Sequence, residues 1–375
     1  MTQQAQDPRA PFLRGTSLRT IPIPRAELPR KLIGGTSTLT LPPTGYGAFI
    51  RLRVSVRFTL AALARWANPV EQAFSLMPNL RLYNNHGTNV VQASAFGLNM
   101  RAQMTRDNYA PEAAPFTNPT QQEFAAGTHV LRFSIDIPLT PNLGRNIDYG
   151  LLALQSNQGR WDLEMQTQPL TAMLQGADGT PAQVTMAEGY TDGTLYFLSV
   201  PDVGNFQPAP LMYGYMFHED LIQSGMSTGT WAYELAPLGG TICRLGAQFI
   251  QKKADGTLAP FDRHIDDYDT DQDGAFIRNI QTVLDNTVTL SNTPIVEHDA
   301  RALALYGQVP GRGGVVWHDA LTALDEPGMF ILPDFGRGFI DPDNYASCKV
   351  TADVNLNGAA LHSVRVLKEY LQVIY

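Results

Sequence analysis

Residues 50–60 read Ile-Arg-Leu-Arg-Val-Ser-Val-Arg-Phe-Thr-Leu. Every even-numbered residue in this stretch is apolar and every odd-numbered residue is polar. Side chains of a strand alternate between two faces, whereas a helix needs apolar residues three or four apart, so the stretch predicts a strand with one buried face. At ~3.3 Å per residue this strand is roughly 36 Å long, about twice the usual length. Strands of that length are typical of a large sandwich or barrel wall.

The same alternation recurs along the chain. Further strands are expected at residues 130–139, 161–166, 193–200, 231–235, 242–250, 350–356 and 364–374. Helices are expected at residues 91–104, 275–284 and 296–306. Many short strands separated by long loops predict an all-β protein with short helices in its loops, built as paired sandwiches or jelly rolls.

Proline and glycine divide the chain into four parts. Residues 201–210 begin and end with proline and read as a linker. Residues 1–35 contain five prolines that forbid a long helix, and they read as an arm. The prediction is therefore an N-terminal arm at 1–35, a first β-rich half at 36–200, the linker at 201–210 and a second half at 211–375.

Charge is scarce and unevenly placed. Charged residues make up 17% of the chain, which is below the ~25% of an ordinary soluble protein, so much of the surface is expected to be buried in subunit contacts. The net charge of −8 argues against nucleic-acid binding by the bulk of the protein. The basic residues of the arm are Arg9, Arg14, Arg19, Arg25, Arg30 and Lys31. They outweigh two acidic residues there, so the arm either contacts an anionic surface or a neighbouring subunit, or is a solubilising tail.

Cysteine and hydropathy patterns restrict the protein class. Cys243 and Cys348 are the only cysteines and have no metal-ligand spacing, so they are expected to be free thiols in a reducing compartment. The N-terminus has no apolar signal core, and no run of 18 apolar residues occurs. The sequence therefore predicts a protein that is neither exported by a signal peptide nor membrane-spanning.

One acidic segment has metal-ligand spacing. Asp269, Asp271 and Asp273 are followed by Gly274, which matches the first half of an EF-hand calcium loop. The twelfth position should be a bidentate glutamate, but it is Ile280. The alternatives are a bound calcium ion or an acidic surface loop that caps a helix; no other cofactor is expected.

The remaining motifs give no positive sign of catalysis. Residues 225–229 satisfy G-x-S-x-G, yet a helix-like segment at 218–224 precedes the serine and a strand follows it, the reverse of a nucleophile elbow. The glycines at 311–314 lack the third spaced glycine of a dinucleotide site. The seven histidines do not cluster at zinc-ligand spacing. A pair of glycosidase carboxylates stays open because its members can be far apart in sequence.

Four segments in order resemble one protein family. They are residues 79–88 with the helix-like 96–104, residues 126–139 with 149–154 and 160–165, residues 193–201 with 213–221, and residues 344–371. Their order and spacing resemble the double jelly-roll major capsid proteins of tectivirus-like phages, which are tailless and have an internal membrane. The resemblance covers most of residues 36–375.

This resemblance implies two eight-stranded jelly rolls in one chain and a trimeric, pseudo-hexagonal capsomer. It implies a non-enzymatic major capsid protein of an icosahedral virion shell, assembled in the host cytoplasm. The implied partners are further copies of the chain, minor capsid or penton proteins and an internal membrane under the arm, without specific nucleic-acid recognition. The alternative function is a carbohydrate-active β-sandwich protein, either a glycosidase or a lectin-like module.

Overall fold

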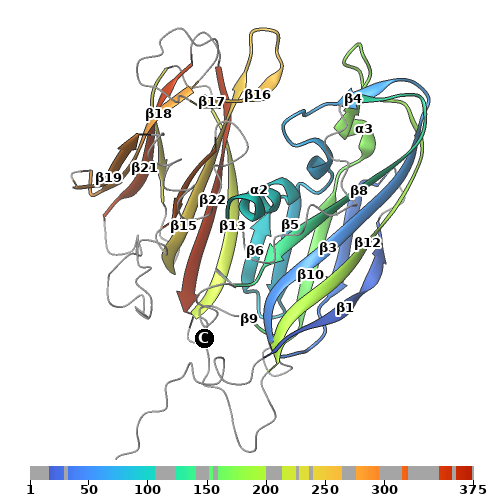
Figure 1. The fold of residues 1–375 in the computed structure, drawn as a ribbon, viewed down its shortest axis with the longest axis horizontal. Coiled ribbons are helices and arrows are strands. Elements are labelled where there is room, and N and C mark those ends of the chain that lie inside the picture. Colours follow the sequence, from blue (N-terminus) through green and yellow to red (C-terminus); the bar gives the residue numbers. More distant parts are fainter. Residues whose placement is uncertain are drawn as a thin grey trace, which may run out of the picture. The chain divides into compact units, whose positions relative to one another are not determined.

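The structure is a computed structural model (Figure 1). It describes residues 17–28, 33–105, 123–140, 152–154, 159–199, 213–224, 228–235, 240–263, 276–286, 288–294, 315–319, 346–356 and 360–373. The chain forms two compact units. The first comprises Met1–Asn99, Asp107–Phe217 and Val373–Tyr375, and the second comprises Met100–Arg106 and His218–Gln372.

The first unit contains two principal antiparallel sheets. One consists, in spatial order, of β1 (Ser17–Glu27), β12 (Val184–Ser199), β3 (Tyr46–Leu60) and β8 (Gly127–Pro138), and β9 (Leu152–Ala153) also pairs with β3. The other consists of β2 (Gly35–Thr40), β10 (Trp161–Thr167), β5 (Asn79–Asn84) and β6 (Asn89–Ala93). Smaller elements are β4 (Ala64–Trp66), η1 (Gln72–Leu76), β7 (Glu123–Phe124), α3 (Leu170–Met173) and β11 (Leu174–Gln175). The helix α2 (Ala95–Thr105) begins in the first unit, and its residues from Met100 onward belong to the second.

The second half of the chain repeats this plan. Its first sheet contains β13 (Tyr213–Gln223), β22 (Ala360–Val373), β15 (Gly240–Lys252) and β20 (Val315–Asp319), with β16 (Leu258–Pro260) on the end of β15. Its second sheet contains β14 (Gly229–Glu234), β21 (Cys348–Asn355), β18 (Phe276–Leu284) and β19 (Val288–Pro294), with β17 (Asp262–Arg263) parallel to β18.

Strand order identifies both halves as jelly rolls. When the eight principal strands of each half are numbered in chain order, the spatial order is first, eighth, third and sixth in one sheet. It is second, seventh, fourth and fifth in the other sheet, and both halves follow this order. This is the double Greek-key order of an eight-stranded jelly roll. The predicted all-β class with two eight-stranded jelly rolls is confirmed.

Strand β3 is the centre of the first roll. It pairs along most of its length with β12 on one side and with β8 on the other. Leu52, Val56 and Phe58 point into the roll and are fully buried, whereas Arg53 and Arg57 on the opposite face are exposed. The alternation in residues 50–60 therefore places one face in the core and the other outside, as predicted.

The N-terminal prediction differs from the structure. Residues 1–35 were expected to form an arm, but Ser17–Glu27 form β1, which pairs with β12 in the first roll. Pro22 and Pro24 exclude a helix, yet a proline is tolerated on an edge strand, and β1 is the outermost strand of its sheet. The predicted linker at 201–210 lies outside the described residues.

Two segments expected to be helical are strands. Residues 275–284 carry apolar side chains at helical spacing, but residues 276–284 form β18. A register shift between Ile277 and Ile280 lets both side chains enter the core, which mimics a helical period. Residues 218–223 belong to β13, where Glu219 and Asp220 find basic partners at Arg365 and Lys368.

The predicted helix at 91–104 is partly correct. Residues 89–93 form β6, and α2 begins at Ala95, where the Ser94 hydroxyl accepts a hydrogen bond from the Gly97 N–H at 2.9 Å and so caps the helix. Residues 296–306 lie outside the description. Within the described ranges, no helix is long and apolar enough to cross a membrane.

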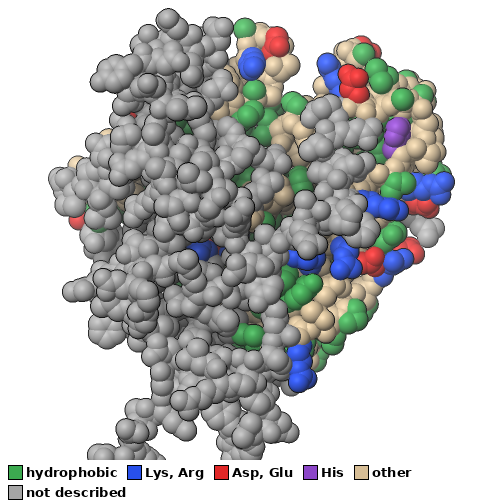
Figure 2. Space-filling view, in the orientation of Figure 1, with side chains coloured by type: hydrophobic (Ala, Val, Ile, Leu, Met, Phe, Trp, Pro, Cys, Tyr) green, Lys and Arg blue, Asp and Glu red, His purple; other side chains and the backbone are tan. Residues whose placement is uncertain are grey.

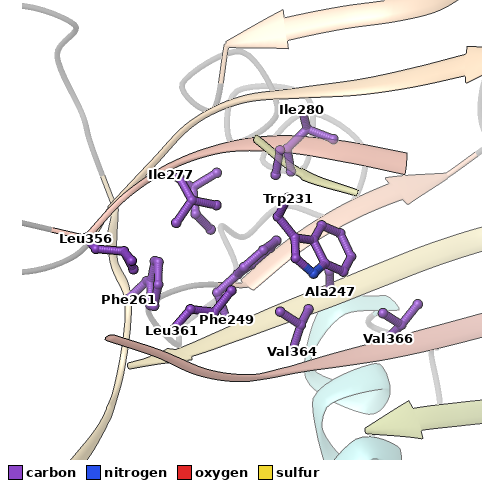
Figure 3. Close-up of a cluster of buried hydrophobic side chains, with 12 residues drawn as sticks. Trp231, Ala247, Phe249, Phe261, Ile277, Ile280, Leu356, Leu361, Val364 and Val366 are labelled. Atoms are coloured by element: carbon purple, nitrogen blue, oxygen red, sulfur yellow. The ribbon is translucent and has the colours of Figure 1, made fainter. Parts of the chain in front are cut away.

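The core of the second roll lies between its two sheets (Figure 3). Trp231 and Ile280 enter it from the β14–β21–β18 sheet, and Phe249 and Val364 enter it from β15 and β22. The ring of Phe249 meets the Trp231 indole edge-on, with ring centroids 5.1 Å apart. The Phe261 ring lies beside Phe249, with centroids 5.9 Å apart. These aromatic contacts hold the two sheets together.

We expect Phe249→Ala to destabilise the protein by about 3–5 kcal/mol, because it removes a fully buried ring and leaves a cavity beneath Trp231. Denaturant unfolding followed by tryptophan fluorescence measures the change. Leu221→Ala is the control, since that side chain is 51% exposed and its loss should cost no more than about 0.5 kcal/mol. A cost below about 1 kcal/mol for Phe249→Ala would contradict this account of the core.

Candidate assembly surface

The outer face of the β1–β12–β3–β8 sheet is rich in arginine. The odd-numbered residues of β3 point away from the core, which brings Arg51, Arg53 and Arg57 onto this face. Acidic residues on the adjacent strands lie directly opposite them, because Arg51 pairs with Asp136, Arg53 with Asp192 and Arg57 with Glu188 in the strand register. Figure 2 shows basic and acidic side chains interspersed over these strands.

Two of the ion pairs on this face have bidentate geometry. Arg25 donates to both carboxylate oxygens of Asp192, at 2.8 and 3.2 Å. Arg51 donates to both oxygens of Asp136, at 2.8 and 3.0 Å. The hydrogen bond to the carboxylate raises the pKa of each guanidinium above its ordinary value. Because the Arg25 pair is largely exposed, it fixes geometry more than it stabilises the fold.

The central part of this face holds charge that is less well compensated. Arg57 lies 3.8 Å from Glu188, and both side chains are more than half exposed. Arg53 has no ion-pair partner among the residues that the structure describes, since Asp192 opposite it is held by Arg25. Arg53 and Arg57 on this face can therefore bind additional carboxylates.

A groove of about 540 Å³ crosses the same face. Its lining includes Arg25, Arg57, Arg132, Glu188 and Tyr190. Two apolar side chains at its rim, Val130 and Met186, are 40% and 41% exposed. Tyr190 is the aromatic residue of the lining, and the Arg25 guanidinium covers its ring at 4.0 Å. A sugar ring therefore finds no open aromatic platform in this groove.

Two stacked aromatic rings lie at one end of the face. The Phe49 and Tyr196 rings are cross-strand neighbours, and they stack with centroids 4.0 Å apart and an interplanar angle of 12°. The Arg51 guanidinium lies 5.6 Å from the Phe49 centroid and 5.7 Å from that of Tyr196. This cation–π arrangement orients Arg51 toward Asp136.

The outer face of the second roll's β14–β21–β18 sheet has the opposite character. Its outward residues on β14 and β21 are Thr230, Ala232, Glu234, Lys349, Thr351, Asp353 and Asn355. Most of these side chains are short, so the face is flat. Lys349 lies 3.5 Å from Glu234, and Asp353 accepts a hydrogen bond from the Thr230 hydroxyl at 3.1 Å. Two carboxylates against one amine make this part of the face acidic.

A buried charge cluster occupies one face of the β15–β22 sheet. The Glu369 carboxylate accepts hydrogen bonds from Arg101 Nε at 2.7 Å and from an Arg244 terminal nitrogen at 2.9 Å. All three side chains are at most 4% exposed. On the same strand Arg365 lies 3.0 Å from Glu219, and this pair is also buried. Such pairs tolerate the loss of one partner poorly.

A second polar cluster joins β13, β22 and β14 of the second roll. Asp220 accepts hydrogen bonds from the Lys368 ammonium at 2.6 Å and from the Tyr233 hydroxyl. Burial alone would raise the pKa of Asp220, but these two hydrogen bonds, together with the positive charges of Lys368 and His218, hold the pKa below its ordinary value. Burial, reinforced by Asp220, raises the pKa of Tyr233 well above its ordinary value. Tyr370 and His218 share a hydrogen bond of 2.9 Å nearby.

The structure locates some of the predicted site residues. Arg19 and Arg25 lie on β1, where Arg25 is held by Asp192, and do not belong to a free arm. Arg9, Arg14, Arg30, Lys31 and the candidate calcium ligands Asp269, Asp271 and Asp273 lie outside the described residues. Elsewhere in the described chain, no group of three His, Cys, Asp or Glu residues is placed to hold a metal. The strands β13 and β14 flank residues 225–227, so a strand follows the serine of the G-x-S-x-G motif where a nucleophile elbow needs a helix.

The sequence analysis missed the buried charges. Residues 364–374 were expected to form a closing strand, and β22 confirms this. The sequence feature that could have revealed them is the presence of Arg365, Lys368 and Glu369 among the apolar residues of this strand. Charges in such a strand indicate paired charges beneath the surface, but the partners come from distant strands.

Comparison with known proteins establishes the fold. No protein-family model and no curated protein sequence matches the chain. The STIV MCP, of Sulfolobus Turreted Icosahedral Virus, aligns with a TM-score of 0.64 at 13% identity over 96% of this chain and 98% of its own. The PBCV-1 virus capsid chain aligns with a TM-score of 0.62 at 9% identity over 95% and 94%. The major capsid protein P2 from Bacteriophage PM2 aligns at 0.50, with 10% identity over 96% and 98%.

The chain has the double jelly-roll fold. The likeness to these structures extends over nearly the whole length of the chain and of each neighbour, so it includes both rolls. At these identities it shows architecture, and the surfaces described above are features of this chain's own residues.

We expect Glu369→Gln to lower the free energy of unfolding by about 3–5 kcal/mol, because the buried Arg101 and Arg244 guanidiniums lose their shared counter-charge. Chemical denaturation at pH 7 measures the loss. Glu164→Gln on β10 makes the same chemical change at a half-buried position and should cost no more than about 0.5 kcal/mol. Equal effects of the two substitutions would refute the role given to Glu369.

The Asp220 cluster should make stability depend on acid. Because the folded-state pKa of Asp220 is depressed, its contribution is present above its ordinary pKa of about 3.9 and is lost as the pH falls through the folded value. Asp220→Asn should therefore destabilise the protein at pH 7, and the difference from wild type should shrink below about pH 4. Unfolding free energies between pH 7 and pH 3 test this; a difference that stays constant would contradict it.

Proposed function

We propose that this chain is a major capsid protein that assembles as homotrimeric capsomers into an icosahedral virion shell. The observation that carries the proposal is the presence of two jelly rolls of identical strand order in one chain, matched over 95–96% of its length by viral capsid chains. The double fold matters because a single jelly roll is shared by many unrelated functions.

Three copies of such a chain supply six rolls of similar outline. A ring of six rolls gives a pseudo-hexagonal capsomer, and hexagonal tiles cover a closed shell when they are combined with other pieces at the vertices. The contact between neighbouring copies in such a ring joins two different surfaces, and it closes when the rotation is a third of a turn. The low content of charged residues, 17%, supports extensive burial between copies.

The proposal includes partners that suit this role. Minor capsid or penton proteins would occupy the vertices, and the basic residues Arg9 and Arg14 before β1 would contact an internal membrane or a neighbouring capsomer. Assembly would take place in the host cytoplasm, where both cysteines stay reduced. The net charge of −8 supports a shell without specific nucleic-acid recognition. The protein would act through self-association, without catalysis.

The carbohydrate-active alternative receives less support. It predicts exposed aromatic side chains along a groove, whereas the groove of the first roll is lined by arginines that cover its tyrosine. The neighbours in architecture are capsid proteins.

Light scattering after size exclusion tests the proposal directly. We expect a stable species of three times 41.2 kDa, or about 124 kDa, and electron micrographs of the concentrated protein should show hexagonal tiles. A monomer of 41.2 kDa at all concentrations would overturn the proposal.

Thermal unfolding with and without a chelator tests whether the aspartate segment holds calcium. If Asp269, Asp271 and Asp273 hold calcium that supports the capsomer, a chelator should lower the trimer's thermal midpoint and added calcium should restore it. Replacement of the three aspartates by asparagine should abolish the response to the chelator. An unchanged midpoint in the wild type would assign the segment to an acidic surface loop.

A further inference from the structure

We propose that the outer face of the first roll's β1–β12–β3–β8 sheet docks on the outer face of the β14–β21–β18 sheet of a second copy, with Arg53 opposite Asp353 and Arg57 opposite Glu234. The inference rests on the proposed trimer and names the surfaces that join neighbouring copies.

Charge complementarity is the first argument. The arginine face carries Arg25, Arg51, Arg53, Arg57 and Arg132 against Glu27, Asp136, Glu188 and Asp192, so it has a net positive charge on a chain whose total is −8. The face on the second roll carries two carboxylates and one amine on β14 and β21. Opposite potentials on two faces favour their association and exclude pairing of like faces.

The spacing of the charges matches. Arg53 and Arg57 are four residues apart on β3, which is ~13 Å along a strand. Asp353 on β21 lies opposite Thr230 on β14, and Thr230 is four residues from Glu234 on the same strand. Asp353 and Glu234 are therefore roughly 14 Å apart. Two arginines on one face can therefore meet two carboxylates on the other at the same time.

The existing pairs are able to exchange partners. Arg57 and Glu188 are 3.8 Å apart, and Lys349 and Glu234 are 3.5 Å apart, so neither pair has the short geometry of the Arg25 pair. When the faces meet, Arg57 lies against Glu234 and Glu188 lies against Lys349, which makes an alternating group of four charges. An alternating group of four charges favours this alignment of the two sheets, because a shifted alignment would bring like charges together.

The shapes of the two faces are also complementary. The first face presents long arginines and the exposed Val130 and Met186, whereas the second is flat around Ala232 and Thr351. Long side chains reach a flat sheet without clash, and two sheets pack with their faces ~10 Å apart. Because the two faces differ and belong to different rolls, the contact is heterologous, and it closes as a ring of three when the rotation between copies is a third of a turn.

A charge-reversal cycle tests the proposal on the full-length chain. Arg53→Glu and Asp353→Arg, each made alone, should weaken trimer association at least about ten-fold, measured as the concentration at half dissociation in light scattering. The variant that carries both reversals should return to within about three-fold of wild type, because the two charges meet again in the opposite sense. Added salt should weaken the association of the wild type. At no salt concentration should either single variant associate more strongly than the wild type.

Arg65→Glu on β4 is the matched control, since it makes the same charge change at an exposed position away from this face. It should leave association within about two-fold of wild type. Thermal unfolding of every variant checks that the monomer fold is intact, which is expected because both reversed residues lie outside the cores.

The outcomes separate the two proposals. A wild-type trimer that the single reversals leave intact would overturn the docking surfaces while leaving the capsid function standing. A double reversal no better than the sum of the single effects would also overturn the pairing of Arg53 with Asp353. A wild-type monomer at all concentrations would overturn both the function and the inference.

Discussion

The alternation of apolar and polar side chains along β3 is the constraint on which the first roll depends. Strand β3 pairs with β12 and β8 at once, so its register sets the register of the whole sheet. A slip of one residue would expose Val54 and Val56 and bury Arg53 and Arg57, which no neighbouring side chain could compensate. The core and the arginine face are thus two consequences of one pattern, and neither can change without the other.

The second roll relies on a different means of fixing its register. Both faces of β15 and β22 are largely buried, so hydrophobicity alone distinguishes the two faces poorly. Charge supplies the distinction, because Arg244 lies directly opposite Glu369 in the register and Arg101 reaches the same carboxylate. A shifted register would leave these charges buried apart from each other, at a cost of several kcal/mol. The buried ions thereby favour one pairing over its alternatives.

The sequence predicted strands wherever alternation was unbroken, and it predicted the jelly-roll class through the order of its segments. It failed at β18, where a bulge between Ile277 and Ile280 imitates a helical period, and at β1, where prolines concealed an edge strand. The arginines of β3 were visible as the polar half of a pattern. Their ion-pair partners Asp136 and Glu188 were not, because these residues come from β8 and β12, which only the topology brings beside β3.

The prolines of β1 have a consequence for the chain in solution. Pro22 and Pro24 lack an N–H group on the outermost strand of the sheet, so this edge offers an interrupted row of donors to any strand that approaches it. Growth of the sheet by addition of further strands, the first step toward fibrous aggregates, is therefore blocked at this border. The first roll can therefore associate through the face of this sheet while its β1 edge resists the addition of strands.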